Sequence, residues 1–201
     1  MALLFAKNNS LSAVTALPAS ISGGGLNLIS TQTASSSSTI DFTSGIASTY
    51  KEYIFKFINI HPSADGSQFL FNLSADTGSN YNVTKTTTAF RSFHSEDDSA
   101  TGLAYYTGGD LAQSTDFQRF ADSLGNDNDQ SLSGTFTLFN PSSTTFVKHF
   151  IANVNYSYDA DYSLQYFLAG YGNTPSAVDA IQFKMNSGNI DSGTIKLYGV
   201  S

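Results

Sequence analysis

Histidine is the residue type most often used for acid–base chemistry near neutral pH and for holding a metal ion. The chain of 201 residues has three histidines, His61, His94 and His149, which are far apart in the sequence. They form no H-E-x-x-H pair, and the chain contains no G-x-S-x-G nucleophile turn and no glycine-rich phosphate loop. The sequence therefore predicts strand-end or surface roles for these histidines, and it disfavours hydrolase and nucleotide chemistry.

Two carboxylates that face each other across a cleft can hydrolyse a glycosidic bond. Glu52 and Glu96 are the only glutamates, and Glu96 with Asp98 is the pair on which a glycan-degrading activity would depend. Most other acids cluster in predicted turns, and tryptophan, a common sugar-stacking residue, is absent. We therefore predict that the chain is not an enzyme, and a glycan-degrading enzyme is kept as a third class.

Two acidic segments supply oxygen ligands of the kind that calcium prefers. They are Asp127-Asn-Asp129 and Asp159-Ala-Asp161, each with two aspartates two residues apart. Neither extends into the full D-x-D-x-D-G loop of a calcium site. Solvated acidic loops are the favoured interpretation, and we predict no metal and no cofactor, while calcium binding by one of these loops stays open.

Tyrosines near the acidic loops are candidates for stacking on sugar rings. The residues considered for glycan contact are Tyr105, Tyr106, Tyr156, Tyr158 and Tyr162. Tyrosines in strands more often belong to a core or an interface, because a buried aromatic ring contributes a large apolar area. Both interpretations remain for this set.

The composition limits the partners of the protein. Charged residues are 12% of the chain, against roughly 25% in an ordinary soluble domain, so Ser, Thr, Asn and Gln must supply most of the polar surface. The net charge is -7 and the few basic residues are scattered, so no basic stripe is present to bind phosphates. Nucleic acid and anionic membrane surfaces are therefore disfavoured as partners, and with Cys 0 stability must come from packing or oligomerisation.

The first 26 residues differ from the rest of the chain, since isolated apolar residues alternate there with polar ones before a triple glycine at 23–25. The segment lacks the features of a signal peptide, and the chain has no apolar run of about 18 residues, so we expect a soluble protein made in the cytosol. A solvated tail carries fewer large apolar residues, so residues 1–26 are predicted to form an N-terminal arm that orders on a partner. The predicted anchoring residues are Leu3, Leu4, Phe5, Leu11, Val14, Leu17 and Ile21.

Residues 27–201 are predicted to form one domain of strands, because apolar and polar residues alternate with a period of two between turn residues. The strongest strand is 50–60, ended by His61-Pro62, and Asp65-Gly66 is predicted to be a hairpin turn. Residues 111–124 have apolar spacings that suit a short helix. The predicted strands cover residues 26–33, 39–43, 50–60, 68–74, 82–94, 133–140, 145–158, 162–171, 177–185 and 193–200.

About ten strands at intervals of 8 to 12 residues are typical of two stacked antiparallel sheets. The predicted fold is therefore an all-β, jelly-roll-like antiparallel β-sandwich that follows an extended N-terminal arm.

Four stretches, 50–62, 125–134, 139–150 and 183–199, resemble structural proteins of tailed bacteriophages that infect marine bacteria, such as cyanophages. The resemblance covers most of the chain and carries no catalytic motif. It implies a virion component, either a head decoration or knob or a tail-associated fibre component, assembled in the host bacterial cytoplasm.

The same resemblance implies a homotrimer whose arm attaches to other virion proteins of the capsid or tail and whose sandwich projects outward. The alternative is a receptor- or carbohydrate-binding tip of a phage fibre, with a host surface glycan as partner.

Overall fold

The structure is a computed structural model that describes residues 25–201. The predicted anchoring residues, from Leu3 to Ile21, lie outside the described residues.

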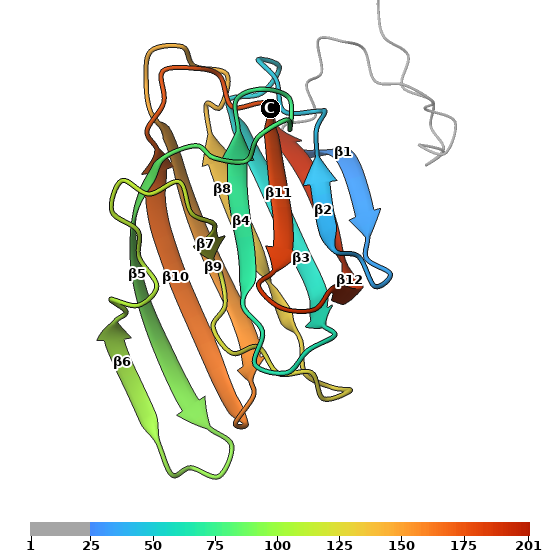
Figure 1. Cartoon of the computed structure of the whole chain (residues 1–201), viewed down its shortest axis with the longest axis vertical. Coiled ribbons are helices and arrows are strands. Elements are labelled where there is room, and N and C mark those ends of the chain that lie inside the picture. Colours follow the sequence, from blue (N-terminus) through green and yellow to red (C-terminus); the bar gives the residue numbers. More distant parts are fainter. Residues whose placement is uncertain (1–24) are drawn as a thin grey trace, which may run out of the picture.

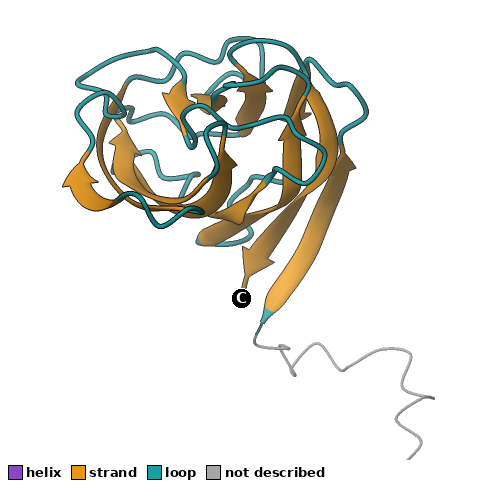
Figure 2. Ribbon diagram, turned by 90° about the horizontal axis from the view of Figure 1, so that it is seen from below, coloured by secondary structure: helices purple, strands orange, loops and turns teal. Residues whose placement is uncertain are grey.

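The strands form two sheets that pack face to face, one of eight strands and one of four (Figures 1 and 2). Every pair of neighbouring strands is antiparallel. The large sheet has the order β1 (Leu26–Thr33), β12 (Ile190–Val200), β3 (Glu52–Pro62), β8 (Leu132–Phe139), β9 (Lys148–Tyr158), β10 (Tyr162–Gly172), β5 (Lys85–Ser95) and β6 (Thr101–Tyr105). The small sheet has the order β2 (Thr39–Phe42), β11 (Ala180–Met185), β4 (Phe69–Ser74) and β7 (Gln118–Arg119).

The predicted all-β antiparallel sandwich is confirmed. The order β1-β12-β3 in the large sheet is repeated by β2-β11-β4 in the small one, so consecutive strands at this end lie in opposite sheets. Residues 25–201 contain no helix, and thus none that is long and apolar enough to cross a membrane. The jelly-roll connectivity itself stays a prediction.

The alternation of side chains along the strands explains the two layers. In β9, Phe150, Ala152 and Val154 are buried, whereas Ile151 and Asn153 between them are exposed. Because successive side chains of a strand point to opposite faces, one face of the large sheet packs on the small sheet and the other faces outward.

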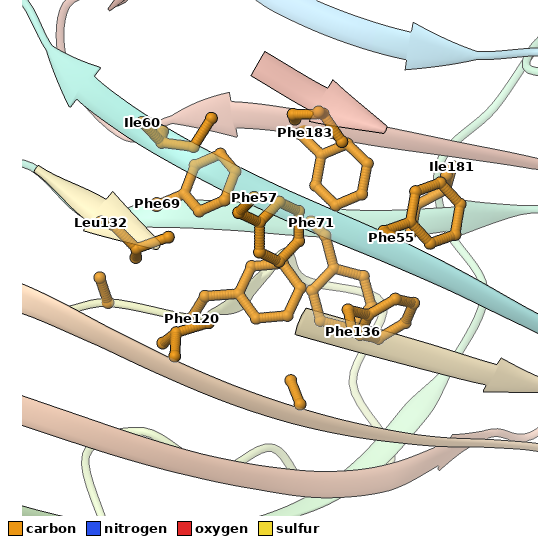
Figure 3. Packing of buried hydrophobic residues seen from close by; sticks show 14 of the residues in the cluster. Phe55, Phe57, Ile60, Phe69, Phe71, Phe120, Leu132, Phe136, Ile181 and Phe183 are labelled. Atoms are coloured by element: carbon orange, nitrogen blue, oxygen red, sulfur yellow. The ribbon is translucent and has the colours of Figure 1, made fainter. Parts of the chain in front are cut away.

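The core between the sheets is built mainly from phenylalanine rings (Figure 3). Phe71 of β4 stacks on Phe120 with ring centroids 4.6 Å apart, and Phe136 of β8 lies 4.8 Å from Phe71. Phe183 of β11 and Phe57 of β3 approach to 5.4 Å edge to face. Offset and edge-to-face pairs of this kind each stabilise a fold by about 1 kcal/mol beyond their buried area.

The helix predicted for residues 111–124 is wrong. The backbone of this segment bonds to other strands instead: Leu111 N–H donates to Thr87 Oγ1, Ser114 pairs with Lys85, and β7 pairs with β4. The apolar residues that suggested a helix serve the sandwich core, where Phe120 is fully buried. Tertiary strand pairing outweighs a weak local helical spacing.

Two details of the predicted turns also change. Strand β3 continues through His61 and ends at Pro62, which pairs with Ile190. The turn at Asp65-Gly66, where Gly66 has a φ of 64°, joins β3 of the large sheet to β4 of the small one, so it is not a hairpin.

A bulge interrupts the alternation of β3. Asn59 has a φ of 50°, and the pairing of β3 with β8 shifts between Phe57 and Ile60. Gly193 lies opposite with a φ of 118°, and a Cβ there would come within 2.5 Å of the carbonyl oxygen of Asn59, so only glycine fits. As a result Ile58 is exposed while Ile60 is buried.

Candidate binding site

A cavity of about 370 Å³ opens on the inner face of the large sheet, where β5 and β9 end and β10 begins. These strands extend past the strands of the small sheet in Figure 1, so no strand of that sheet lies over them there. The lining residues are Arg91, Phe93, Ala100, Tyr158, Ala160, Tyr162 and Leu164.

Three aromatic rings form the wall of this cavity. Tyr162 lies at the start of β10, with its ring centroid 5.8 Å from Tyr158 and 5.7 Å from Phe93, both edge to face. All three side chains are partly exposed. Their mutual packing fixes the ring planes, so the cavity is shaped before any ligand arrives.

The polar group of the cavity is the guanidinium of Arg91. Its Nη1 lies 3.1 Å from Oδ2 of Asp122, and its Cζ lies 4.1 Å from the centre of the Tyr106 ring. The ion pair and the cation–π contact together hold the planar group in one orientation.

Asp122 is the centre of the network beneath the cavity. Its carboxylate accepts a hydrogen bond of 2.6 Å from the Tyr106 hydroxyl and lies 3.6 Å from Nη1 of Arg119. Its backbone N–H donates to the Tyr156 hydroxyl at 3.0 Å. Burial raises the pKa of Tyr106 and, far more strongly, that of Tyr156, so both phenols stay neutral at physiological pH.

The rim of the cavity is acidic. Residues 96–100 join β5 to β6, and residues 159–161 join β9 to β10. These two turns carry five carboxylates in total, and the backbone N–H of Glu96 donates to the carbonyl of Asp161, which ties them together. Arg91 is already neutralised by Asp122, so the surroundings of the cavity repel anions.

The five tyrosines considered for glycan contact occupy different places. Tyr158 and Tyr162 line the cavity together, and Tyr106 supports Arg91 from below. Tyr156 is 1% exposed, so its ring has no free face to offer a sugar. Tyr105 is 54% exposed but lies with Phe90 on the outward face of the large sheet, where its hydroxyl donates to Asp110.

Arg91, Phe93 and Leu164 line the cavity but were not among the residues predicted for a binding site. The period-two alternation indicates that Arg91 and Phe93 point inward, since they alternate with the outward residues of β5 in the same way as the buried Ala89. A charged side chain that points inward needs an ion-pair or hydrogen-bond partner, so the sequence could have identified Arg91 as a candidate site residue.

The candidate acids and histidines do not converge. Glu96 and Asp98 are exposed on the turn after β5, where Asp98 pairs with His94 at 3.3 Å. The ring of His61 lies next to the Gln130 carbonyl, at 2.7 Å. Within residues 25–201, no three His, Asp or Glu side chains come close enough to hold a metal ion.

No protein-family model matches the chain, and no curated protein matches it either.

Proposed function

We propose that this chain is a non-enzymatic structural protein of a tailed-phage virion, anchored to the particle by residues 1–26 and displaying the β-sandwich outward. It serves as a head decoration or as a tail-associated component. The sequence resemblance of four separate stretches to phage structural proteins motivates the proposal.

The structural observation that supports a scaffold role is the eight-stranded sheet. Of the sixteen acidic residues only two, Glu52 and Asp191, lie in its strands, and the lysines Lys56 and Lys196 add few further charges to its outward surface, which is formed mostly by uncharged polar and apolar side chains. Such a surface packs against protein without the cost of removing ions from water.

The test is incorporation into particles. A chain without residues 1–25 keeps all twelve strands and is expected to fold, as circular dichroism dominated by β-structure would show. It is expected to be missing from purified virions in which the full chain is present. Normal amounts of the truncated chain would contradict the anchoring role, and absence of the full chain from virions would contradict the virion role.

The second candidate is a carbohydrate-binding tip, and the cavity at Tyr158 and Tyr162 favours it. Aromatic walls stack on the apolar faces of sugar rings, and Arg91 offers fixed donors to hydroxyl groups. Because the rim is acidic, the ligand of this candidate is a neutral glycan.

A glycan array with the purified chain separates the two candidates. If the cavity binds sugar, Tyr162→Ala is expected to weaken binding at least about tenfold, which corresponds to one lost stacking contact. Tyr105→Ala is the matched control, because Tyr105 lies on the opposite face of the sheet. Binding at background for the wild type, or equal losses in both variants, would remove this candidate.

A further inference from the structure

The outward face of the eight-stranded sheet carries most of the exposed apolar side chains. Eight large hydrophobic residues are exposed within residues 25–201, and all but Phe146 lie on strands of this sheet with outward-pointing side chains. They are Leu26, Leu28, Ile58, Phe90, Leu103, Tyr105 and Ile151. Exposed apolar groups gathered on one face mark an interaction surface.

One row of side chains crosses this face from the β1 edge toward the middle. The strand register places Leu28 beside Tyr198, Tyr198 beside Ile54, Ile54 beside Thr137, and Thr137 beside Ile151. We call these five residues the central row. Each is partly or fully exposed, and none carries a charge.

Opposite charges flank the central row on strand β3. Glu52 lies two residues before Ile54, and Lys56 lies two residues after it, with all three side chains on the outward face. The Lys56 ammonium lies 5.5 Å from the centre of the Tyr198 ring. Among residues 25–201, neither Glu52 nor Lys56 takes part in an ion pair.

We propose that two copies of this chain pack against each other through this face, with a twofold axis that runs along the central row. With this axis, each strand of one copy lies over the same strand of the second copy, and the two strands run in opposite directions. Ile54 and Ile151 then contact their own equivalents, and Glu52 of one copy faces Lys56 of the other, twice in the interface.

The size of the face suits a stable pair. Strands β1, β12, β3, β8 and β9 together are roughly 24 Å wide at the usual strand spacing, and strands of eight to eleven residues are about 30 Å long. The contact therefore covers on the order of 700 Å² per copy, close to the area of a specific protein interface. This proposal does not depend on the virion role.

The test is the oligomeric state of the full chain and of a charge swap. Size-exclusion chromatography with light scattering is expected to give twice the chain mass of 21.5 kDa. Glu52→Lys is expected to weaken the pair at least about tenfold, since it places lysine opposite lysine at two points. Lys56→Glu is expected to do the same, and the double variant is expected to restore the pair.

Two control variants keep the test specific. Asp129→Lys makes the same charge change at an exposed site outside the strands and is expected to leave the pair intact. Ile151→Ser is expected to weaken the pair. Phe146→Ser is not expected to do so, although it removes the one large hydrophobic residue within residues 25–201 that is exposed outside this sheet.

A wild type that stays monomeric at about 100 μM, well above the dissociation constant of a specific dimer of this area, would overturn the proposal. A homotrimer, as the phage resemblance implies, would also overturn the twofold arrangement, and so would a charge swap that fails to restore association.

Discussion

The side-chain nitrogen of Lys85 is buried and donates a hydrogen bond to the side-chain oxygen of Asn72. Lys85 is the first residue of β5 and is fully enclosed, and its Nζ also donates to the carbonyl of Val83 at 2.8 Å. Burial lowers the pKa of Lys85 from 10.5 to about 7, while the negative charge of the Asp116 carboxylate opposes that change.

The stability of the protein is therefore expected to rise with pH. Between about pH 7 and pH 10.5 the folded chain holds Lys85 neutral while the unfolded chain holds it protonated, so raising the pH favours the folded state. The free energy of unfolding is expected to gain up to about 4 kcal/mol across this window. Urea unfolding at a series of pH values measures it.

Lys85→Met is expected to remove most of this pH dependence, because methionine has a similar shape and does not titrate. The control is Lys51→Met, which removes a lysine that is exposed. A wild-type slope that persists in Lys85→Met would show that another group is responsible.

Phe71→Ala is expected to lower the free energy of unfolding by about 4 kcal/mol, because it leaves a cavity among Phe120, Phe136 and Phe150. Chemical denaturation followed by tyrosine fluorescence measures the change. Phe146→Ala removes a ring that is 68% exposed and should change stability by less than about 0.5 kcal/mol. Similar losses in the two variants would argue against the packing described for the core.

Asp122→Asn is expected to destabilise the chain by about 2 kcal/mol. The substitution keeps the size of the side chain but removes the carboxylate that Arg91 and Arg119 share. The two positive charges then repel each other without a negative charge between them. Thermal unfolding measures the loss. Asp98→Asn, in the exposed pair with His94, is the comparison and should have almost no effect.

Gly109→Ala is expected to cost about 2 kcal/mol, because an added Cβ would lie 1.9 Å from the Tyr166 hydroxyl and 2.4 Å from the Tyr106 ring. At the adjacent Gly108 the nearest atom is 3.4 Å away, so Gly108→Ala should be tolerated. If both variants unfold at the same temperature, the loop is softer than the contacts of Gly109 indicate.

The sequence predicts the sandwich well because the apolar alternation is strong in long strands such as β9 and β10. Prediction from the sequence fails where a local residue pattern disagrees with the way the strands pair in the fold. Ile58 and Ile60 share one parity in the sequence, yet the bulge at Asn59 sends them to opposite sides of the sheet. The residues around Asn59 do not predict the bulge, since an Asn at this position is also compatible with the end of an ordinary strand.

The cavity was only partly predictable. Tyr158 and Tyr162 stand out by type and by their nearness to acidic turns, but Arg91 comes from a strand far away in the sequence. Its place beside them depends on the pairing of β5 with β10, in which Leu164 lies opposite Phe93 and Tyr166 opposite Arg91. Such a neighbourhood is a property of strand order, which alternation alone does not specify.

The two hairpin ends that surround the cavity, residues 96–100 and 159–161, contribute no side chain to the hydrophobic core between the sheets. Their length and side chains can therefore be exchanged while the packed interior, and with it the thermodynamic stability, is preserved. Related chains with different hairpin ends would have the same β-sandwich and would differ in the ligands that they bind.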